Sequence, residues 1–426
     1  MKNLSEKIRN YPGHLLLYVK AMAKWVTVSA VVGILCGLLG SAFHFGVERA
    51  TLIRGLHPWI LYTLPLAGLL AVAIYRVFRA EGLGTNNILS EIQNGTGISA
   101  GLLPAIFLST VLTHLAGGSA GREGAALQMG GSIGYYAAKL FRLDDRDMRT
   151  ATMIGMAAFF SALFGTPLAA AVFSMEVVSV GLIYHAAFVP CLTASLIAYG
   201  VSLLLGIEPT RFAVTVPALS ASLLLRAAVL AAFCAVLSAL FCGVLHLTEK
   251  GLHKALPNEW LRAFLGGAFL LGLTLLFGTG DYNGAGMGVI TRAVEEGQAI
   301  PTAFIWKMIF TAVTLAVGFR GGEVVPSFFV GATFGCLAGP LLGLPAGFAA
   351  ALGLTAVFCG AVNSPIASTF LAAELFGGEG LIYYALVCGI SYTLSGYSGL
   401  YSSQRILYDK LKARYIDVRT NAWHEH

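Results

Sequence analysis

The chain repeats itself half-way along its length, and this duplication limits its possible folds more than any other feature. The segment GMAAFFSALFGTPLAAAVFSMEV begins at Gly155, and GLTAVFCGAVNSPIASTFLAAEL begins at Gly353. The two align without a gap at an offset of 198 positions, which places Pro167 opposite Pro365. We infer that a unit of roughly 200 residues occurs twice, as internal repeats do in many membrane transporters.

Each half also carries a glutamate beside glycine in a glycine-rich segment. The first segment reads GREGAALQMGGSIG from Gly121 and contains Glu123, and the second reads GGEVVPSFFVGATFG from Gly321 and contains Glu323. Repeats of this kind place a binding site near the membrane midplane, where the two units meet and interrupted helices supply the contacts. The two glutamates are therefore the first candidates for a functional site.

The composition requires lipid around much of the chain. Hydrophobic residues make up 57% of the sequence and charged residues 11%, and the mean hydropathy is +0.77. A single soluble core cannot bury that much apolar surface. Glycine accounts for 51 of the 426 residues, which suits close helix packing and irregular backbone at membrane depth. We predict an all-α integral membrane protein with tilted and broken helices.

Positive charges flank the apolar runs. The formal net charge is +6, but the basic residues form no groove-sized patch, so we expect no nucleic-acid partner. They precede the first apolar run and follow the last, at Lys2, Lys7, Arg9, Lys20, Lys24, Arg405, Lys410, Lys412, Arg414 and Arg419. The positive-inside rule then puts both termini in the cytoplasm, with an even number of crossings. We expect no cleavable signal peptide and read the seven cysteines as small core residues.

Changes in composition divide the chain into five parts. We expect a cytoplasmic N-terminal segment over 1–20, a first membrane repeat over 21–206, a linker over 207–222, a second membrane repeat over 223–410 and a cytoplasmic C-terminal tail over 411–426. The linker is polar and rich in β-branched residues. We expect no soluble domain after the last apolar run.

Glu123 and Glu323 lie between glycine and apolar residues, where a permanently charged carboxylate is costly. Each is therefore expected to take up and release a proton near neutral pH, which points to proton transfer. The alternative is a charge that Arg122 or a helix N-terminus neutralises and that serves structure alone. We favour the functional interpretation for both residues.

Both glutamates precede a helix, and this predicts the kind of ligand. The amides of Gly124 and Ala125 begin one helix, and those of Val324 and Val325 begin the other. Helix N-termini that point inward attract anions without a fixed charge. The ligand is therefore expected to be an anion that competes with a carboxylate side chain.

Other polar residues have simpler interpretations. Glu176 and Glu374 occupy equivalent places in the two halves, and we read them as structural groups that hold backbone or a neighbouring helix end. The loop Gly84-Thr85-Asn86-Asn87 breaks a helix and leaves amides in need of a partner, unless it is an ordinary surface turn. No nucleotide loop, Ser-His-Asp set or zinc signature is present, so we expect no enzyme, no metal and no cofactor.

Four motifs together resemble the CLC family of anion channels and proton-coupled antiporters. They are the GREG motif, the loop near Gly84, the segment 321–326 and the pair Tyr401–Ser402, and the resemblance runs from about residue 25 to residue 410. It implies a homodimer in which each subunit forms its own anion pathway from two inverted repeats of tilted, broken helices.

The resemblance also assigns roles. It matches Glu123 with the external gating glutamate of the family, whose carboxylate occupies an anion site when charged and leaves it when protonated. It carries Tyr401 onto the tyrosine whose hydroxyl faces the central anion. The internal proton-transfer glutamate of the family would fall just after Glu176, but this chain has Val177 there.

The departures from the chloride-transporting pattern look like the fluoride-transporting branch, bacterial fluoride/proton antiporters. The usual serine loop is replaced by Thr85-Asn86-Asn87, Glu323 lies where the pattern has Gly-x-Phe-x-Pro, and Ala125 replaces a proline. In that branch the carboxylate matching Glu323 is held to matter for coupling and fluoride handling. The resemblance therefore implies a bacterial inner-membrane location.

We expect a fluoride exporter driven by proton entry, with Glu123 as gate and Glu323 as second carrier of protons or fluoride. Fluoride accepts strong hydrogen bonds, so its site needs donors, for which we name Thr85, Asn86, Tyr401 and the amides of Gly124, Val324 and Val325. The alternatives are a chloride/proton exchanger, a passive anion channel, and a membrane scaffold or enzyme that transports nothing.

Overall fold

The computed structural model describes residues 2–421, and it describes side chains from Tyr18 onward. The histidines of the expected tail, His424 and His426, lie outside the described residues. The first half of the chain contains α1 (Lys2–Leu56), η1 (Pro58–Thr63), α2 (Leu64–Val77), α3 (Thr85–Asn94), α4 (Leu102–Ala116), α5 (Glu123–Leu140), α6 (Asp145–Phe164), α7 (Pro167–Glu176), β1 (Ser179–Val180), η2 (His185–Ala187) and α8 (Phe188–Leu204). The second half contains α9 (Ala221–Ala255), α10 (Glu259–Phe277), α11 (Met287–Thr291), the π-helical turn η3 (Arg292–Glu296), α12 (Ala303–Ala316), α13 (Val324–Leu341), α14 (Ala346–Val362), α15 (Pro365–Phe376), η4 (Gly378–Gly380), α16 (Leu381–Leu394), β2 (Arg405–Tyr408) and β3 (Tyr415–Arg419).

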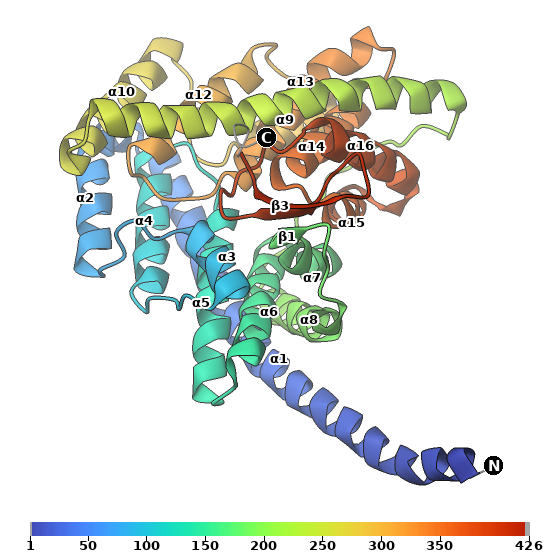
Figure 1. Ribbon diagram of the computed structural model, residues 1–426. Helices are drawn as coiled ribbons and strands as arrows, with labels where there is room; N and C mark the ends of the chain where they lie inside the picture. The colour runs from blue at the N-terminus through green and yellow to red at the C-terminus, as the bar shows by residue number, and fades with distance from the viewer. Residues whose placement is uncertain (1, 422–426) are drawn as a thin grey trace.

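The chain is a multi-pass membrane protein. Among the described residues, six helices are long and apolar enough to cross a bilayer. Large apolar side chains are exposed along α1, α2, α8, α9 and α10, and Leu204 and Leu276 are 89% and 78% exposed. Side chains of this kind face lipid in a membrane protein. The expected N-terminal segment is continuous with the first membrane helix, because α1 runs unbroken from Lys2 and its N-terminal part projects from the molecule (Figure 1).

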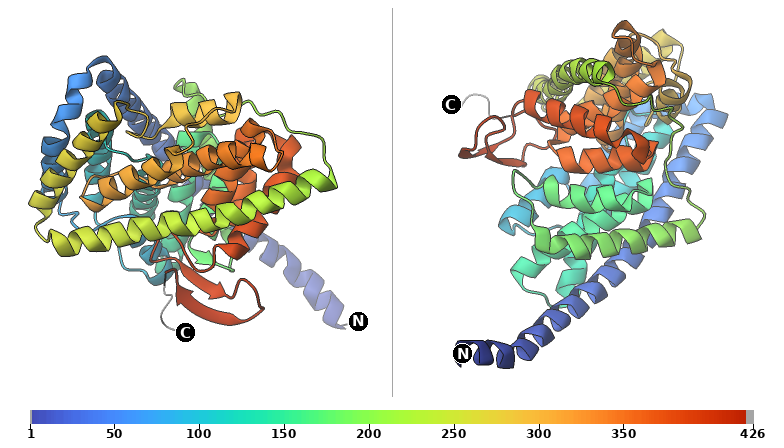
Figure 2. Two further views of the ribbon diagram at one scale, coloured as in Figure 1. Left: turned by 90° about the horizontal axis from the view of Figure 1, so that it is seen from above. Right: turned by 90° about the vertical axis from the view of Figure 1, so that its right-hand side faces the viewer.

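The two halves of the chain are stacked, and the right-hand view of Figure 2 shows most of the second half (yellow to red) above the first (blue to green). Within each half, one pair of helices packs at very short range, α5 with α6 and α13 with α14. A Cβ on Gly130 would lie 2.2 Å from the carbonyl oxygen of Gly155, and one on Gly331 would lie 2.3 Å from that of Gly353. The glycines that the duplication aligns therefore make the same contact twice.

Glu176 and Glu374 hold neighbouring helix ends, as the sequence predicted, and in each case that helix belongs to the other half. The Glu176 carboxylate accepts hydrogen bonds from the amides of Ile366 (3.2 Å) and Ala367 (2.8 Å) at the beginning of α15. Glu374 does the same at the beginning of α7, where Leu168 donates at 3.1 Å and Ala169 at 2.9 Å. Each half thus caps a helix of the other half and satisfies amides that have no partner within their own helix.

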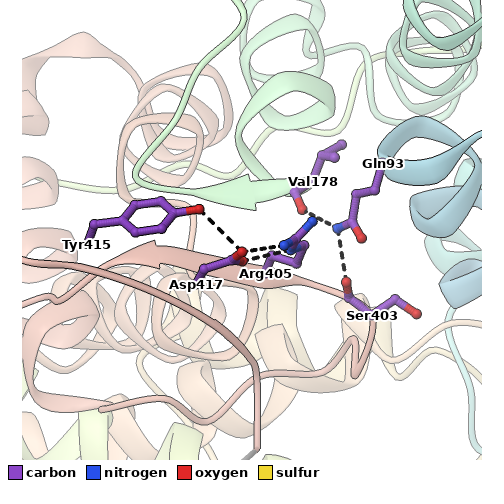
Figure 3. A network of polar contacts seen from close by, with 6 residues as sticks. All are labelled: Gln93, Val178, Ser403, Arg405, Tyr415 and Asp417. Carbon is purple, nitrogen blue, oxygen red and sulfur yellow. Dashed lines mark hydrogen bonds and ion pairs between the residues drawn. The ribbon is translucent and has the colours of Figure 1, made fainter.

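The structure confirms the mainly helical expectation and adds one small sheet. Its strand order is β1-β2-β3, with β1 parallel and β3 antiparallel to β2, so the segment expected to be a tail contributes a strand. Figure 3 shows the polar contacts that surround it. Gln93 Nε2 donates to the carbonyls of Val178 (2.8 Å) and Ser403 (2.9 Å), and Arg405 pairs with Asp417 across the hairpin. These contacts fix the chain that follows Tyr401 against the end of α7.

Candidate functional site

The two glycine-glutamate loops meet at the centre of the molecule. Gly121 N donates to Gly322 O at 2.7 Å, and Gly322 N donates to Gly121 O at 2.8 Å, which makes an antiparallel bridge between the halves. The chain enters α5 at Glu123 on one side of this bridge and α13 at Val324 on the other. Two helix N-termini and two glutamates are thereby brought to one place.

The bridge requires glycine because the backbones touch. A Cβ on Gly322 would lie 2.3 Å from the amide nitrogen of Gly124, a distance that real Cβ atoms do not show. A Cβ on Gly121 would lie 2.5 Å from Oε2 of Glu123. Glycine is the residue that permits such an approach.

Glu123 is almost completely buried, with 2% of its surface exposed. Its Oε2 accepts a hydrogen bond of 2.8 Å from the backbone amide of Arg122, and its Oε1 lies 3.6 Å from the Nε of the same arginine. The carboxylate is therefore folded back over the start of its own helix, with one cation beside it. A carboxylate at a helix N-terminus also gains from the dipole of that helix.

Glu323 is half-buried and lies differently. Its Oε2 is 3.2 Å from the point where a Cβ would stand on Gly124, so the carboxylate reaches across the bridge to the beginning of α5. The acidic Glu249 of α9 lines a cavity together with Glu323. Among the described residues, no ion pair of Glu323 with an arginine is recorded, whereas Arg122 stands beside Glu123. The two glutamates are thus equivalent in sequence but not in environment.

Each glutamate lines a cavity of its own. A cavity of about 880 Å³ reaches Glu123 and is lined by His44, Arg54, His114 and Arg122 among others; we call it the Glu123 cavity. A second cavity, of about 460 Å³, reaches Glu323; we call it the Glu323 cavity. Its walls include Thr85, Asn86, Gln128, Glu249, Arg320 and Tyr401. The Gly121–Gly322 bridge lies between the two glutamates, so each opens to a different cavity.

Tyr401 offers a free donor in the Glu323 cavity. The residue is 1% exposed, and its hydroxyl has no hydrogen-bond partner among the described residues. Tyr401 and Glu323 line the same cavity. A buried hydroxyl without a partner is costly unless a ligand or water satisfies it.

Thr85 and Asn86 lie at the start of α3 in the same cavity, but both already have partners. The Thr85 hydroxyl accepts from Gln128 Nε2 at 3.1 Å and is 3.5 Å from Gly124 O. Asn86 Oδ1 accepts from Ser403 N at 3.0 Å and so ties the loop to the segment that follows Tyr401. The structure therefore places Thr85 and Asn86 in one cavity, as named from the sequence. The contact of Asn86 Oδ1 positions the loop.

Val324 and Val325 begin α13 and are fully buried. Helix geometry leaves the first amides of α13 without partners inside the helix, and the same holds for Gly124 in α5. Pro326 follows in the first turn, where its missing N–H costs nothing. All the site residues named from the sequence thus lie around one bridge.

Sequence reasoning missed Gln128. This residue of α5 is 5% exposed, its amide nitrogen donates to Thr85, and its Oε1 is buried without a partner among the described residues. It lies four residues after Gly124, on the same helix face, and it is a polar residue in the mainly apolar first half of α5. That spacing is the signal that would have identified it.

Val177, the residue after Glu176, is held by a hydrogen bond to its backbone carbonyl. Gln404 Nε2 donates to the carbonyl of Val177 at 2.9 Å and to that of Val362 at 2.8 Å. The Val177 side chain is completely buried and carries no titratable group. The position after α7 therefore carries no proton acceptor, and Glu176, which ends α7, does not line either cavity.

Comparisons with known proteins agree with this geometry. A family model described as voltage gated chloride channel matches residues 67–396. A chloride/fluoride channel protein of Pseudomonas syringae pv. tomato is 35% identical over 406 residues, which cover 93% of this chain and 89% of that protein. An H+/Cl− exchange transporter of Vibrio campbellii is 26% identical over 397 residues, covering 85% of this chain and 84% of the relative.

Solved structures show the same architecture. A CLC-type fluoride/proton antiporter superposes with a TM-score of 0.87 at 31% identity, covering 90% of this chain and 98% of that chain. A slow cyanobacterial Cl−/H+ antiporter superposes with a TM-score of 0.75 at 20% identity, covering 87% of this chain and 94% of that chain. The second likeness concerns the fold alone.

Proposed function

Because this chain belongs to the voltage gated chloride channel family, we propose that it exports fluoride from the cytoplasm in exchange for protons. The relatives that favour fluoride are the chloride/fluoride channel protein and the fluoride/proton antiporter structure. The observation that carries the proposal is the pair of carboxylates on either side of the Gly121–Gly322 bridge, each open to a different cavity.

In this proposal Glu123 is the gate. When charged, its carboxylate occupies the helix N-terminus that an anion would otherwise use, and the amide of Arg122 holds it there. Protonation removes the charge that the amide and the helix dipole favour, so the side chain leaves and the anion can enter. Proton uptake and anion passage are coupled because the two events exclude each other at one site.

Glu323 is the second carrier. Its carboxylate reaches the beginning of α5 from the Glu323 cavity, so it too competes with an anion at that helix end. Because Val177 cannot carry a proton, Glu323 takes that role in the Glu323 cavity, whose wall also contains Glu249. A protonated Glu323 can also donate a hydrogen bond to fluoride.

The donors for fluoride come from around the bridge. The unpartnered Tyr401 hydroxyl, the Thr85 hydroxyl and the amides of Gly124, Val324 and Val325 together replace water around a small anion. Asn86 contributes by fixing the loop through Ser403, and its side-chain nitrogen remains a candidate donor. We expect transport rather than catalysis, and no group of His, Cys, Asp and Glu that could hold a metal ion occurs among the described residues.

The orientation follows from the charges. The N-terminal part of α1 carries basic residues, and Lys24 of α1 pairs with Asp147 in the first turn of α6. The positive-inside rule places this face in the cytoplasm, so both termini are cytoplasmic and the Glu123 cavity opens to the outside. We further propose a homodimer in a bacterial inner membrane, whose molar mass in detergent would be twice 44.8 kDa after correction for bound detergent.

The experiment that tests the proposal measures fluoride, chloride and proton flux in proteoliposomes. For the unmodified protein we expect fluoride efflux that drives proton uptake against a gradient, with little chloride movement. Glu123→Gln should lose both fluxes, because the amide cannot take up the proton.

Each other result identifies an alternative. Chloride flux equal to fluoride flux would favour a chloride/proton exchanger, and fluoride flux without proton movement a passive channel. No flux of either ion would favour a protein that transports nothing. Glu379→Gln, a change of the same kind in η4 outside both cavities, serves as the matched control and should change nothing.

A further inference from the structure

A row of polar side chains leads along the wall of the Glu123 cavity to the buried gate. Glu48 is the exposed end, with 55% of its side chain accessible, and its Oε2 lies 3.7 Å from the Nε2 of His44. The Nδ1 of His44 lies 2.9 Å from the Nη1 of Arg122. Arg122 is in turn the cation beside Glu123. The row joins a group in contact with water to the glutamate that the proposed function makes the gate.

The chemistry of this row fixes the state of His44. An arginine only donates hydrogen bonds, so Nδ1 of His44 must be the acceptor of the bond from Arg122. The ring is therefore neutral, and its single hydrogen is on Nε2, facing Glu48. A second proton could enter only at Nδ1, where it would point at the guanidinium and break the bond.

The Arg122 guanidinium lies near two further groups. Its Nη2 lies 3.5 Å from the carbonyl of Leu163, and its Nε lies 3.6 Å from Oε1 of Glu123. The hydrogen bond to His44 thus holds the guanidinium 3.6 Å from the Glu123 carboxylate, near the limit of ion-pair distance. If that bond is lost and His44 becomes a cation, repulsion moves Arg122 away from the ring, and the attractive partner within reach is the carboxylate of Glu123.

We propose that His44 is a positioning residue for the gate: as a neutral ring it keeps Arg122 from closing on Glu123, and as a cation it releases Arg122 onto the carboxylate. Arg122 then stabilises the charged form of Glu123 and opposes the proton uptake on which transport depends. Acid outside the cell consequently slows the turnover of the protein. This inference rests on the proposed function of Glu123.

The other charged and titratable groups around the ring do not replace these partners. On α1 the nearby groups are Glu48 and Arg54, and Arg54 is engaged with the carbonyl of His114 on α4. Beyond them, Asp281 and Arg292 on the far wall pair with each other at 3.2 Å. Among the described residues, only Glu48 and Arg122 are recorded in polar contact with His44. Glu48 favours the imidazolium and Arg122 disfavours it.

The test compares three variants and one control while pH is set equally on both sides of the vesicle, between about pH 7.5 and 4, because the guanidinium 2.9 Å from the ring opposes a second proton and moves its uptake toward acid. His44→Asn keeps a neutral acceptor where Nδ1 stands and cannot gain a charge. Its fluoride flux should equal that of the unmodified protein at the upper pH and exceed it by roughly threefold or more at the lower pH. His44→Leu removes the acceptor and should be slow throughout.

Glu48→Gln removes the carboxylate that stabilises the imidazolium, so the decline of flux should begin at lower pH than in the unmodified protein. His57→Asn is the matched control, because His57 is exposed beyond the end of α1 and should leave the profile unchanged. If His44→Asn follows the pH profile of the unmodified protein, or if His57→Asn alters it equally, the proposal is wrong. His44→Asn and Glu48→Gln decide the matter even if the leucine variant does not fold.

A spectroscopic readout separates this inference from the proposed function. In protein labelled with 15N-histidine, the signal that disappears in His44→Asn belongs to His44. At neutral pH it should show an unprotonated Nδ1 and a protonated Nε2, and acid should convert it to the imidazolium. The opposite tautomer would overturn the proposal whether or not fluoride moves, whereas absent proton-coupled flux with the expected tautomer would count against the function alone.

Discussion

The two halves of the molecule share their helix packing, but the side chains around their equivalent glutamates differ. Glu123 and Glu323 each lead into a glycine-rich helix, yet Glu123 is buried beside Arg122 while Glu323 reaches across to Gly124 under the influence of an acidic neighbour. By contrast, Glu176 and Glu374 make the same pair of backbone contacts in both directions. The contacts that hold the helix ends are thus the same in both halves, whereas the charged residues near Glu123 differ from those near Glu323.

The difference teaches that equivalent carboxylates need not do equivalent work. A cation beside Glu123 favours its charged form and gives it a resting position, whereas Glu323 has an acidic residue in its field. Exchange of a proton for an anion needs carboxylates that change state at different moments. The asymmetry of the surroundings supplies that difference where the sequence repeat alone cannot.

The largest expected effect comes from Glu323→Gln. The amide keeps the shape of the side chain but carries no transferable proton, so proton-coupled fluoride flux should fall by roughly 10²-fold or more, as for loss of a group that transfers protons. Simultaneous records of pH and fluoride in proteoliposomes measure it. If proton coupling survives in this variant and is lost only in Glu123→Gln, the second carboxylate is not a carrier.

Substitutions of the two bridge glycines by alanine should have different consequences. Gly322→Ala places a Cβ 2.3 Å from a backbone nitrogen, so it should cost more than about 3 kcal/mol and reduce the yield of folded protein. Gly121→Ala places its Cβ 2.5 Å from Oε2 of Glu123, a side chain that can move, so the protein should fold with an altered gate.

Thermal unfolding in detergent and fluoride flux distinguish the two glycine variants. Gly272→Ala is the control, because Gly272 lies in α10 outside both cavities and nothing lies within 4 Å of its Cβ position. Equal stability of the Gly121 and Gly322 variants would contradict the reasoning from contact distance.

Glu176→Gln and Glu374→Gln should destabilise the protein equally. Each carboxylate accepts from two backbone amides, and the amide oxygen of glutamine can replace only part of that, so we expect a loss of about 1–3 kcal/mol in each case. Midpoints of thermal unfolding for the two variants provide the comparison. A loss in one variant alone would mean that the two caps differ in energy despite their geometry.

The smallest effect concerns a contact found only in the second half. Asn363 and Gly165 are equivalent positions that end α14 and α6 in the left-handed conformation, but only Asn363 has a side chain that accepts from Lys410 Nζ, at 2.5 Å. Lys410 lies in the hairpin between β2 and β3, and burial lowers the pKa of its amine to about 7.

The sign of the pH effect follows from this pKa. Between about pH 7 and the ordinary lysine value of 10.5, the unfolded chain binds the proton more strongly than the folded protein does. Stability should therefore rise with pH through this interval and level off above it. Lys410→Met should remove this contribution, so the unfolding midpoints of the two proteins should diverge as pH changes. Parallel curves would show that the amine is not titrating there.

The sequence predicted the membrane class, the duplication and the two glutamates, since apolar runs and aligned glycines reflect contacts within and between helices. It also predicted that Glu176 and Glu374 hold neighbouring helix ends. It did not predict the sheet of β1, β2 and β3, because strands this short carry no periodic signal and gain their pairing from segments far apart in the chain. Gln128 was missed for a related reason, as its partner Thr85 lies 43 positions away.

The sequence by itself determined that this chain lies in a bilayer, that it is built twice from one unit, and that each unit carries an acidic group beside a helix N-terminus. Only the tertiary structure decided that the two loops bridge at Gly121 and Gly322, that each glutamate opens to its own cavity, and that Arg122 stands between His44 and Glu123. The physical reason is that hydropathy and helix ends are properties of neighbouring residues. The field around a buried charge is set by side chains that only folding brings together.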